Sequence, residues 1–392
     1  MTRITKIVLG LLIIVILALV GAGVYWYLAN SGTGAGGNTR SFLFFPGGGG
    51  AVGGGETSGG GEPLTGDSGG KTQSRLMQIV KESVIGAVLN KDETKVLYYK
   101  RAGGNLFQAN LDGQNEENKS NLTIIGLTDV RWSPSRERAV LGYIDDGVLR
   151  YLIENVATSS TVFLPQRVTS ASWQPETGAL IAYTEITENG LRIVTANAQL
   201  KNQQTLFTSP IPEYTVSWVD KTNLVALTRP TYFATSLSQI ISTSKKSSEF
   251  VPVRGLGVLP SPNGGLLAIG GVDANGALLP IRFVDIKGRE AGSSNVRTLV
   301  EKCAWRPDGA ELICAAPKNN AGSLPDSWQK GIVSFEDMLV KIDSRTGIAV
   351  DLPGTEGGLF DATGIFLDSQ NKYLFFTNKR DSTLWRLELA AE

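Results

Sequence analysis

A unit of apolar runs and tight turns recurs along the chain from residue 71 to the C-terminus. Each copy has one apolar run, a short turn rich in Pro, Gly, Asp or Asn, and a second apolar run, which predicts two antiparallel strands joined by a turn. The copies begin at residues 89, 132, 173, 218, 260, 305 and 367, at intervals of 43, 41, 45, 42, 45 and 62 residues. Such a repeat constrains the fold strongly, because every unit must bury its apolar faces against its neighbours.

Three copies show the unit most clearly. Residues 132–135 read Trp-Ser-Pro-Ser, residues 173–178 read Trp-Gln-Pro-Glu-Thr-Gly and residues 305–309 read Trp-Arg-Pro-Asp-Gly. None of the intervals contains the amphipathic stretch of about 15 residues that a crossover helix would need. Because about 40 to 45 residues form one four-stranded propeller blade, the sequence predicts an all-β protein, a seven-bladed β-propeller of four-stranded antiparallel blades.

The two ends of the repeat region predict how the ring closes. Residues 75–80 precede the first copy and belong to no blade, whereas only residues 373–377 and 383–389 remain for strands after the seventh turn. We expect the first segment to pair with the last blade and complete it, which leaves no unpaired sheet edge there. In the first blade we expect the third and fourth strands at residues 105–109 and 122–125. An open pair of β-sandwiches is the alternative fold.

The N-terminal segment differs from the repeats in composition. Residues Ile7 to Leu28 contain no charge, and as a helix they would span about 33 Å, enough for about 30 Å of hydrocarbon. Arg3 and Lys6 precede this run and the next charge is Arg40, so the positive-inside rule predicts a cytoplasmic N-terminus and a propeller outside the cytoplasm. We therefore expect a single-pass membrane protein, with a cleaved signal peptide as the alternative.

Glycine dominates the next stretch of the chain. Residues 31–70 include 17 glycines and only four charged residues, a composition that cannot form a packed core. We therefore expect three parts. These are a cytoplasmic stub with a transmembrane helix at residues 1–30, a flexible linker at 31–70, and a propeller at 71–392 closed by an N-terminal strand.

Charge and composition argue against several function classes. The chain has 37 Lys plus Arg and 37 Asp plus Glu, so no net positive field is available for a nucleic-acid backbone, and nucleic-acid binding is not expected. The absence of histidine excludes a Ser-His-Asp triad and the commonest metal ligand. We therefore predict no catalytic residue, no cofactor and no metal ligand, and an enzymatic activity is not favoured.

Two residue types predict structural roles. The motif tryptophans recur at one position of the repeat, where large side chains are expected to pack neighbouring blades together. Cys303 and Cys314 flank one hairpin at facing positions. They form either a cross-strand disulfide or a buried pair of thiols.

The longest departure from the repeat is an insertion at residues 318–337. A loop there would project from one face of the propeller, which makes it the best candidate for a partner contact. Trp328 either packs against the propeller or is offered to a partner. The candidate interaction residues are Leu324, Pro325, Asp326, Trp328 and Lys330.

The motif around Trp132, Trp173 and Trp305 resembles the propeller repeat of TolB and of dipeptidyl-peptidase propellers, a distant relative of WD repeats. The resemblance covers residues 71–392, but the chain departs from the peptidases because it has neither an α/β-hydrolase region nor a Gly-x-Ser-x-Gly motif. The resemblance implies a propeller of the cell envelope that binds a protein or another ligand. It is informative about the fold and says little about which ligand is bound.

Two functions remain open. The first is a membrane-tethered, extracytoplasmic scaffold that binds an envelope protein, a peptide or another ligand. The alternative is a propeller enzyme, lactonase-like or glycan-cleaving, that uses carboxylates in the central channel; this requires several carboxylates to converge within about 5 to 10 Å. Carboxylates near the first strands are Glu82, Asp129, Glu213, Glu301 and Asp361.

Overall fold

The structure, a computed structural model, describes residues 76–319, 322–355 and 358–389. The predicted transmembrane helix at Ile7 to Leu28 and the predicted linker lie outside these residues. Within the described part of the chain, no helix is both long enough and apolar enough to span a bilayer.

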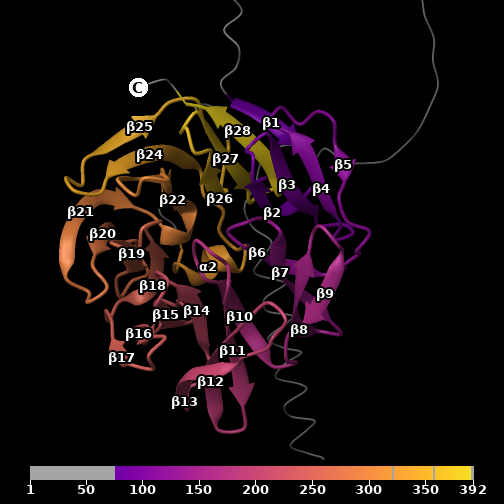
Figure 1. The fold of residues 1–392 in the computed structure, drawn as a ribbon. Coiled ribbons are helices and arrows are strands. Elements are labelled where there is room, and N and C mark those ends of the chain that lie inside the picture. The colour runs from indigo at the N-terminus through magenta and orange to yellow at the C-terminus, as the bar shows by residue number, and fades with distance from the viewer. Residues whose placement is uncertain (1–75, 320–321, 356–357, 390–392) are drawn as a thin grey trace, which may run out of the picture. The chain divides into compact units, whose positions relative to one another are not determined.

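Seven four-stranded antiparallel sheets lie around a ring, and the first strand of each repeat copy is nearest its centre (Figure 1). The predicted seven-bladed propeller is therefore confirmed. We number the blades one to seven in the order of the sequence copies.

The first three blades follow the chain without interruption. Blade one consists of β2 (Val84–Leu89), β3 (Lys95–Lys100), β4 (Leu106–Asn110) and β5 (Glu117–Asn118). Blade two consists of β6 (Leu127–Trp132), β7 (Arg138–Asp145), β8 (Val148–Asn155) and β9 (Ser160–Phe163). Blade three consists of β10 (Val168–Trp173), β11 (Ile181–Thr187), β12 (Gly190–Ala196) and β13 (Gln204–Ser209).

The remaining blades include two short helical turns. Blade four consists of β14 (Tyr214–Trp218), β15 (Asn223–Thr228), β16 (Ser238–Ser242) and β17 (Ser247–Glu249), and blade five of β18 (Arg254–Pro260), β19 (Leu267–Val272), β20 (Pro280–Val284) and β21 (Glu290–Arg297). Blade six consists of β22 (Cys303–Trp305), β23 (Glu311–Pro317), β24 (Asp337–Asp343) and β25 (Ala349–Leu352). Blade seven consists of β26 (Ala362–Leu367), β27 (Tyr373–Asn378), β28 (Thr383–Glu388) and β1 (Leu76–Val80). The 3-10 helix η1 (Val300–Lys302) precedes β22, and α2 (Asp326–Gln329) lies in the insertion.

Blade seven combines the two ends of the described chain. β1 pairs antiparallel with β28, with Leu76 opposite Leu387 and Val80 opposite Leu384. Backbone hydrogen bonds between the first and last strands thus close the ring, which is the pairing expected from the sequence.

The outer strand of blade one lies elsewhere than the sequence predicted. It is β5 at Glu117–Asn118, and residues 122–125 form no strand. The buried side chain of Ile124 packs instead in the core between blades one and two, and the nitrogen of Ile124 donates to the oxygen of Gly103 at 3.1 Å. This apolar stretch therefore fills the space between two blades, because that position buries more surface than a blade edge does.

Burial varies across each blade in the way that a propeller requires. All six residues of β19, the second strand of blade five, are buried, whereas all three residues of β17, the outermost strand of blade four, are exposed. Inner strands are covered on both faces by neighbouring blades, so their sequences are continuously apolar rather than alternating.

The motif tryptophans tie successive blades together. Each indole nitrogen donates to a backbone oxygen on the first strand of the preceding blade. The pairs are Trp132 with Gly86 at 2.7 Å, Trp173 with Arg131 at 3.0 Å, Trp218 with Ser172 at 3.2 Å and Trp305 with Leu259 at 3.0 Å. The expected packing role is confirmed, and the hydrogen bonds explain why the repeat uses tryptophan rather than phenylalanine.

The two faces of the propeller differ in their connections. We call the face that carries the turns between first and second strands the turn face, and the opposite face, which carries the insertion, the insertion face. The described chain begins at Leu76 on the turn face, because β1 runs antiparallel to β28 and ends beside Leu384 at the insertion face.

A disulfide joins the first two strands of blade six. Cys303 and Cys314 face each other in β22 and β23, with their Cα atoms 4.0 Å apart. Of the two alternatives that the sequence left open, the structure has the bridge.

Candidate binding site in the central channel

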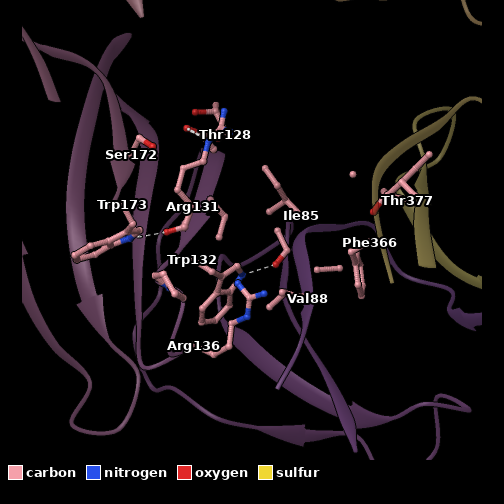
Figure 2. Close-up of a pocket in the computed structure, with 17 residues that line it drawn as sticks. Ile85, Val88, Thr128, Arg131, Trp132, Arg136, Ser172, Trp173, Phe366 and Thr377 are labelled. Atoms are coloured by element: carbon pink, nitrogen blue, oxygen red, sulfur yellow. Dashed lines mark hydrogen bonds and ion pairs between the residues drawn. The ribbon is translucent and has the colours of Figure 1, made fainter. Parts of the chain in front are cut away.

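A cavity of about 590 Å³ lies along the wall of the central channel (Figure 2). Its lining comes mainly from the first strands of blades seven, one, two and three, namely β26, β2, β6 and β10. The turn between β6 and β7 contributes Pro134 and Arg136, so the cavity extends to the turn face. A concave site of this size accommodates a peptide segment or a small ligand.

One side of the cavity is apolar. Ile85 and Val88 of β2 lie opposite Phe366 of β26, and the indole of Trp132 lies to their left in Figure 2. The indole nitrogen of Trp132 is already used by Gly86, so its ring presents only carbon atoms to the cavity. This wall can bury an apolar side chain but offers few hydrogen bonds.

The other side carries a charged pair on β6. Asp129 and Arg131 are two residues apart and therefore share one face of the strand, and the Nε of Arg131 donates to Oδ1 of Asp129 at 2.9 Å. Asp129 is the main reason that the pKa of Arg131 is raised. The Arg131 side chain is 61% exposed, because it lies in a channel that admits water. Because its partner Asp129 lies on the same strand, the charge of Arg131 is largely satisfied within β6.

Arg136 lies at the edge of the cavity on the turn face. Burial of its guanidinium lowers its pKa, and the charge of Glu93 only partly opposes this effect. Within the described residues, the guanidinium of Arg136 has no hydrogen-bond or ion-pair partner. It is therefore available to an anionic group that enters the cavity.

The insertion covers the opposite end of the channel. It leaves blade six after β23, and Figure 1 shows α2 within the ring formed by the first strands. Asp326 accepts hydrogen bonds from Thr231 and Tyr232 of blade four at 3.0 Å, and the nitrogen of Leu324 donates to Gly276 of blade five at 3.3 Å. The segment therefore spans several blades across the insertion face.

A buried charge cluster holds the insertion in place. Lys302 is 0% exposed and forms ion pairs with Asp337, at 2.9 Å, and with Asp361. The indole nitrogen of Trp328 and the backbone nitrogen of Phe335 also donate to Asp361, at 2.9 and 3.0 Å. Burial alone would raise the pKa of Asp361, but the charge of Lys302 and these hydrogen bonds outweigh it, and the pKa lies below its usual value.

The candidate interaction residues of the insertion have different positions. Leu324, Pro325 and Trp328 are buried, Asp326 is half-buried and hydrogen-bonded to blade four, and Lys330 is exposed. Trp328 is 5% exposed and its ring stacks on Phe335. Packing against the propeller, the first alternative for Trp328, is therefore the observed one. A contact of the segment with a partner stays a prediction, and among the five candidate residues Lys330 is the exposed one.

Three of the carboxylates considered for catalysis have separate cationic partners. Glu82 pairs with Lys100, Asp129 with Arg131 and Asp361 with Lys302, each in a different place. No group of three or more His, Cys, Asp or Glu side chains is positioned to hold a metal ion among the residues that the structure describes.

Glu301 is the carboxylate that remains in the channel near the insertion. Enclosure by the surrounding protein raises its pKa, and a hydrogen bond from Gln329 and the charges of Lys302, Lys379 and Arg131 only partly offset this. Its side chain nevertheless stays exposed to the water of the channel.

Sequence reasoning overlooked both Arg136 and Lys302. Arg136 occupies the place in its turn that glycine takes at Gly264 and Gly309, so an alignment of the turns could have singled it out. Lys302 gives no comparable signal, because its two partners are 35 and 59 residues away in the sequence. Only the fold brings these charges together.

The comparisons with known proteins support the fold. No protein-family model matches the chain, and no curated protein matches it in sequence. Among solved structures, the chain is similar to an oligogalacturonate lyase from Vibrio parahaemolyticus, with a TM-score of 0.57, 8% identity, and coverage of 80% of this chain and 89% of that one. It is also similar to a chain of the mitotic checkpoint complex, with a TM-score of 0.55, 15% identity, and coverage of 86% and 100%.

TolB from Acinetobacter baumannii is a further match, with a TM-score of 0.44, 11% identity, and coverage of 69% of this chain and 63% of that one. The propeller fold expected from the sequence is confirmed by the seven four-stranded sheets and by the likeness to the two other structures. The protein is thus a seven-bladed β-propeller with a channel that is covered at the insertion face and has a cavity extending to the turn face.

Proposed function

We propose that the protein is a membrane-tethered, extracytoplasmic binding module that takes a protein or peptide partner of the cell envelope into the turn-face end of its channel. The observation that carries this proposal is the cavity of about 590 Å³, with an apolar wall on β2 and β26 and charged groups on β6 and the following turn. A few polar groups around an apolar pocket are typical of recognition sites.

The lining favours binding over catalysis. A glycan-cleaving or lactonase-like mechanism needs carboxylates close to one another in the channel, whereas Glu82, Asp129 and Asp361 near the first strands each pair with a different cation. One structurally similar chain is part of the mitotic checkpoint complex, so a propeller of this size is compatible with a role in a protein assembly. That likeness concerns the fold and does not identify a partner.

The tether is inferred from the sequence. The uncharged stretch from Ile7 to Leu28 would anchor the chain, and the glycine-rich residues 31–70 would form a flexible linker whose ends lie about 35 Å apart on average. The described chain begins on the turn face, the face to which the cavity extends. A flexible linker of this length would keep the propeller near the membrane without orienting it.

Capture of partners by the tagged, detergent-extracted full chain tests the proposal. Thr128 is exposed in the channel and lines the cavity, so Thr128→Trp should fill the site and reduce specific capture at least about tenfold, the equivalent of about 1.4 kcal/mol. Ser160→Trp places the same bulk on the exposed outer strand of the same blade and should leave capture unchanged. Equal capture by both variants, with folding verified by circular dichroism, would exclude binding in the channel.

The tether has its own test. Deletion of residues 7–28 should release the chain from the membrane fraction, and external protease should reach the propeller in intact spheroplasts of the wild type. Protection of the propeller from protease would contradict the predicted orientation.

A further inference from the structure

Five blades have the same turn between their first and second strands. In each, the backbone nitrogen of the fourth turn residue donates to the oxygen of the first, and the fourth residue has a positive φ. The residues at this position, with their φ angles, are Glu93 at 55°, Arg136 at 62°, Gly264 at 67°, Gly309 at 70° and Asn371 at 55°.

Glycine adopts this left-handed conformation without steric cost, and asparagine tolerates it better than most residues. Long charged side chains gain nothing from it, so Glu93 and Arg136 are strained choices at positions where the same chain uses glycine in blades five and six. Residues held in such conformations point to a compensating role.

Glu93 has a visible compensation inside the protein. Its Oε2 accepts hydrogen bonds from the nitrogen and the hydroxyl of Ser369, at 2.9 and 2.6 Å. Since Ser369 belongs to the equivalent turn of blade seven, the side chain of Glu93 links two neighbouring blades.

Arg136 has no such compensation among the described residues. Its side chain borders the channel cavity and also a second cavity of about 380 Å³ toward the outside of blades one and two. The other arginine of the channel cavity, Arg131, is held by Asp129. Of these two arginines, Arg136 is therefore the one whose guanidinium is available to a ligand.

We propose that Arg136 anchors the C-terminal carboxylate of a peptide whose last side chain lies on the apolar wall formed by Ile85, Val88 and Phe366. This inference rests on the proposed binding function and names the ligand class. The planar guanidinium matches a carboxylate through two parallel hydrogen bonds.

Two features of the site distinguish a chain end from other carboxylates. The insertion covers the far end of the channel, so a chain can enter but a long strand cannot pass through. The wall beside Arg136 is built from aliphatic and aromatic carbon, which suits an apolar side chain and offers few partners to the hydroxyls of an acidic sugar.

The test measures fluorescence anisotropy with the detergent-solubilised full chain. The probes are fluorescein-labelled pentapeptide pools that end in leucine, valine or phenylalanine as the free acid, and the same pools as C-terminal amides. An amide pool with one internal glutamate and a labelled trigalacturonate separate the other sources of a carboxylate. We expect the free-acid pool to bind at least about tenfold more tightly than the other three probes.

Variants at the two strained positions provide a matched pair. Arg136→Gly should weaken binding of the free-acid pool at least about tenfold while the melting temperature stays the same or rises, because glycine relieves the backbone. Arg136→Lys should restore part of the binding, since lysine keeps the charge without the planar fork. Glu93→Gly should leave binding within about twofold of the wild type and give no stabilisation beyond that of Arg136→Gly, because it loses the link to Ser369.

The outcomes separate this proposal from the function on which it rests. Equal binding of acid and amide pools, or binding unaffected by Arg136→Gly, overturns the role of Arg136 even if Thr128→Trp still abolishes capture of partners. Tighter binding of trigalacturonate or of the internal glutamate overturns the assignment to a peptide C-terminus. If Thr128→Trp does not reduce the capture of partners, the proposed binding function itself is overturned.

Discussion

The two ends of the channel use similar charged groups in opposite ways. At the insertion face, Lys302 is fully buried and two carboxylates and two aromatic rings surround it. At the turn face, Arg136 lies at the edge of a cavity, and no partner for it is found in the described residues. A cation whose partners come from the protein stabilises the fold, whereas a cation that lacks them is available for recognition.

The cost of burial explains the difference. Removing an ion from water is unfavourable by several kcal/mol unless its partners are positioned around it. The cluster at Lys302 meets this condition, since hydrogen bonds from Trp328, Ser334 and Phe335 also satisfy Asp361. The turn-face end keeps Asp129 and Arg131 near water and leaves the half-buried Arg136 at the edge of a cavity. We expect substitutions to change stability at the first end and binding at the second.

The largest effect is expected from Asp361→Ala. Lys302 would lose one of its two carboxylates, and the insertion would lose its hydrogen bonds to Asp361. We expect the free energy of unfolding to fall by about 3 to 5 kcal/mol, as for other broken buried ion pairs, measured by urea denaturation of the full chain in detergent. A change below about 1 kcal/mol would show that the cluster does not stabilise the fold.

Trp328→Ala should have the next largest effect. The indole is 5% exposed, stacks on Phe335 and donates to Asp361, so its loss leaves a cavity and removes one of the donors to Asp361. We expect destabilisation of about 3 kcal/mol. Phe233→Ala is the control, because that ring is 68% exposed and should matter by less than about 0.5 kcal/mol. If Trp328→Ala keeps the melting temperature of the wild type but no longer captures a partner, the indole belongs to an interface instead.

Reduction of the disulfide, which lies at the same end of the channel, should have a smaller effect on stability. The bridge closes a loop of 11 residues next to Lys302, which corresponds to about 2 to 3 kcal/mol in the chain-entropy description. Urea denaturation with and without a phosphine reductant measures it. The Cys303→Ala/Cys314→Ala double variant should not respond to the reductant, and an equal midpoint for the oxidised and reduced wild type would refute the prediction.

Asp129→Asn should affect stability least. Asp129 pairs with Arg131 in the cavity of the channel. Their side chains are 29% and 61% exposed. Exposed pairs of this kind contribute about 0 to 1 kcal/mol, so the melting temperature should change by no more than a few degrees. A loss as large as that of Asp361→Ala would mean that both ends of the channel stabilise the fold, and the contrast between them would disappear.

The predictability of each feature from the sequence follows from the range of the interactions behind it. The strand pairs and turns are local, so the tryptophans at residues 132, 173 and 305 predicted the blades and their packing. The fourth strand of blade one was placed wrongly, because an apolar run such as residues 122–125 can fill a space between blades as well as form a strand. For Trp328 the sequence offered two alternatives, since burial depends on partners that are distant in the chain.

The sequence by itself determined the number of blades, the closure of the ring by its own first strand and the structural use of the tryptophans, because each of these follows from a periodic pattern of burial. Only the tertiary structure decided that the insertion covers one end of the channel and that, at the other, the guanidinium of Arg136 has no partner among the described residues. Both depend on contacts between residues of different blades, and a pattern of apolar and polar positions along the chain does not encode which charges meet across the ring.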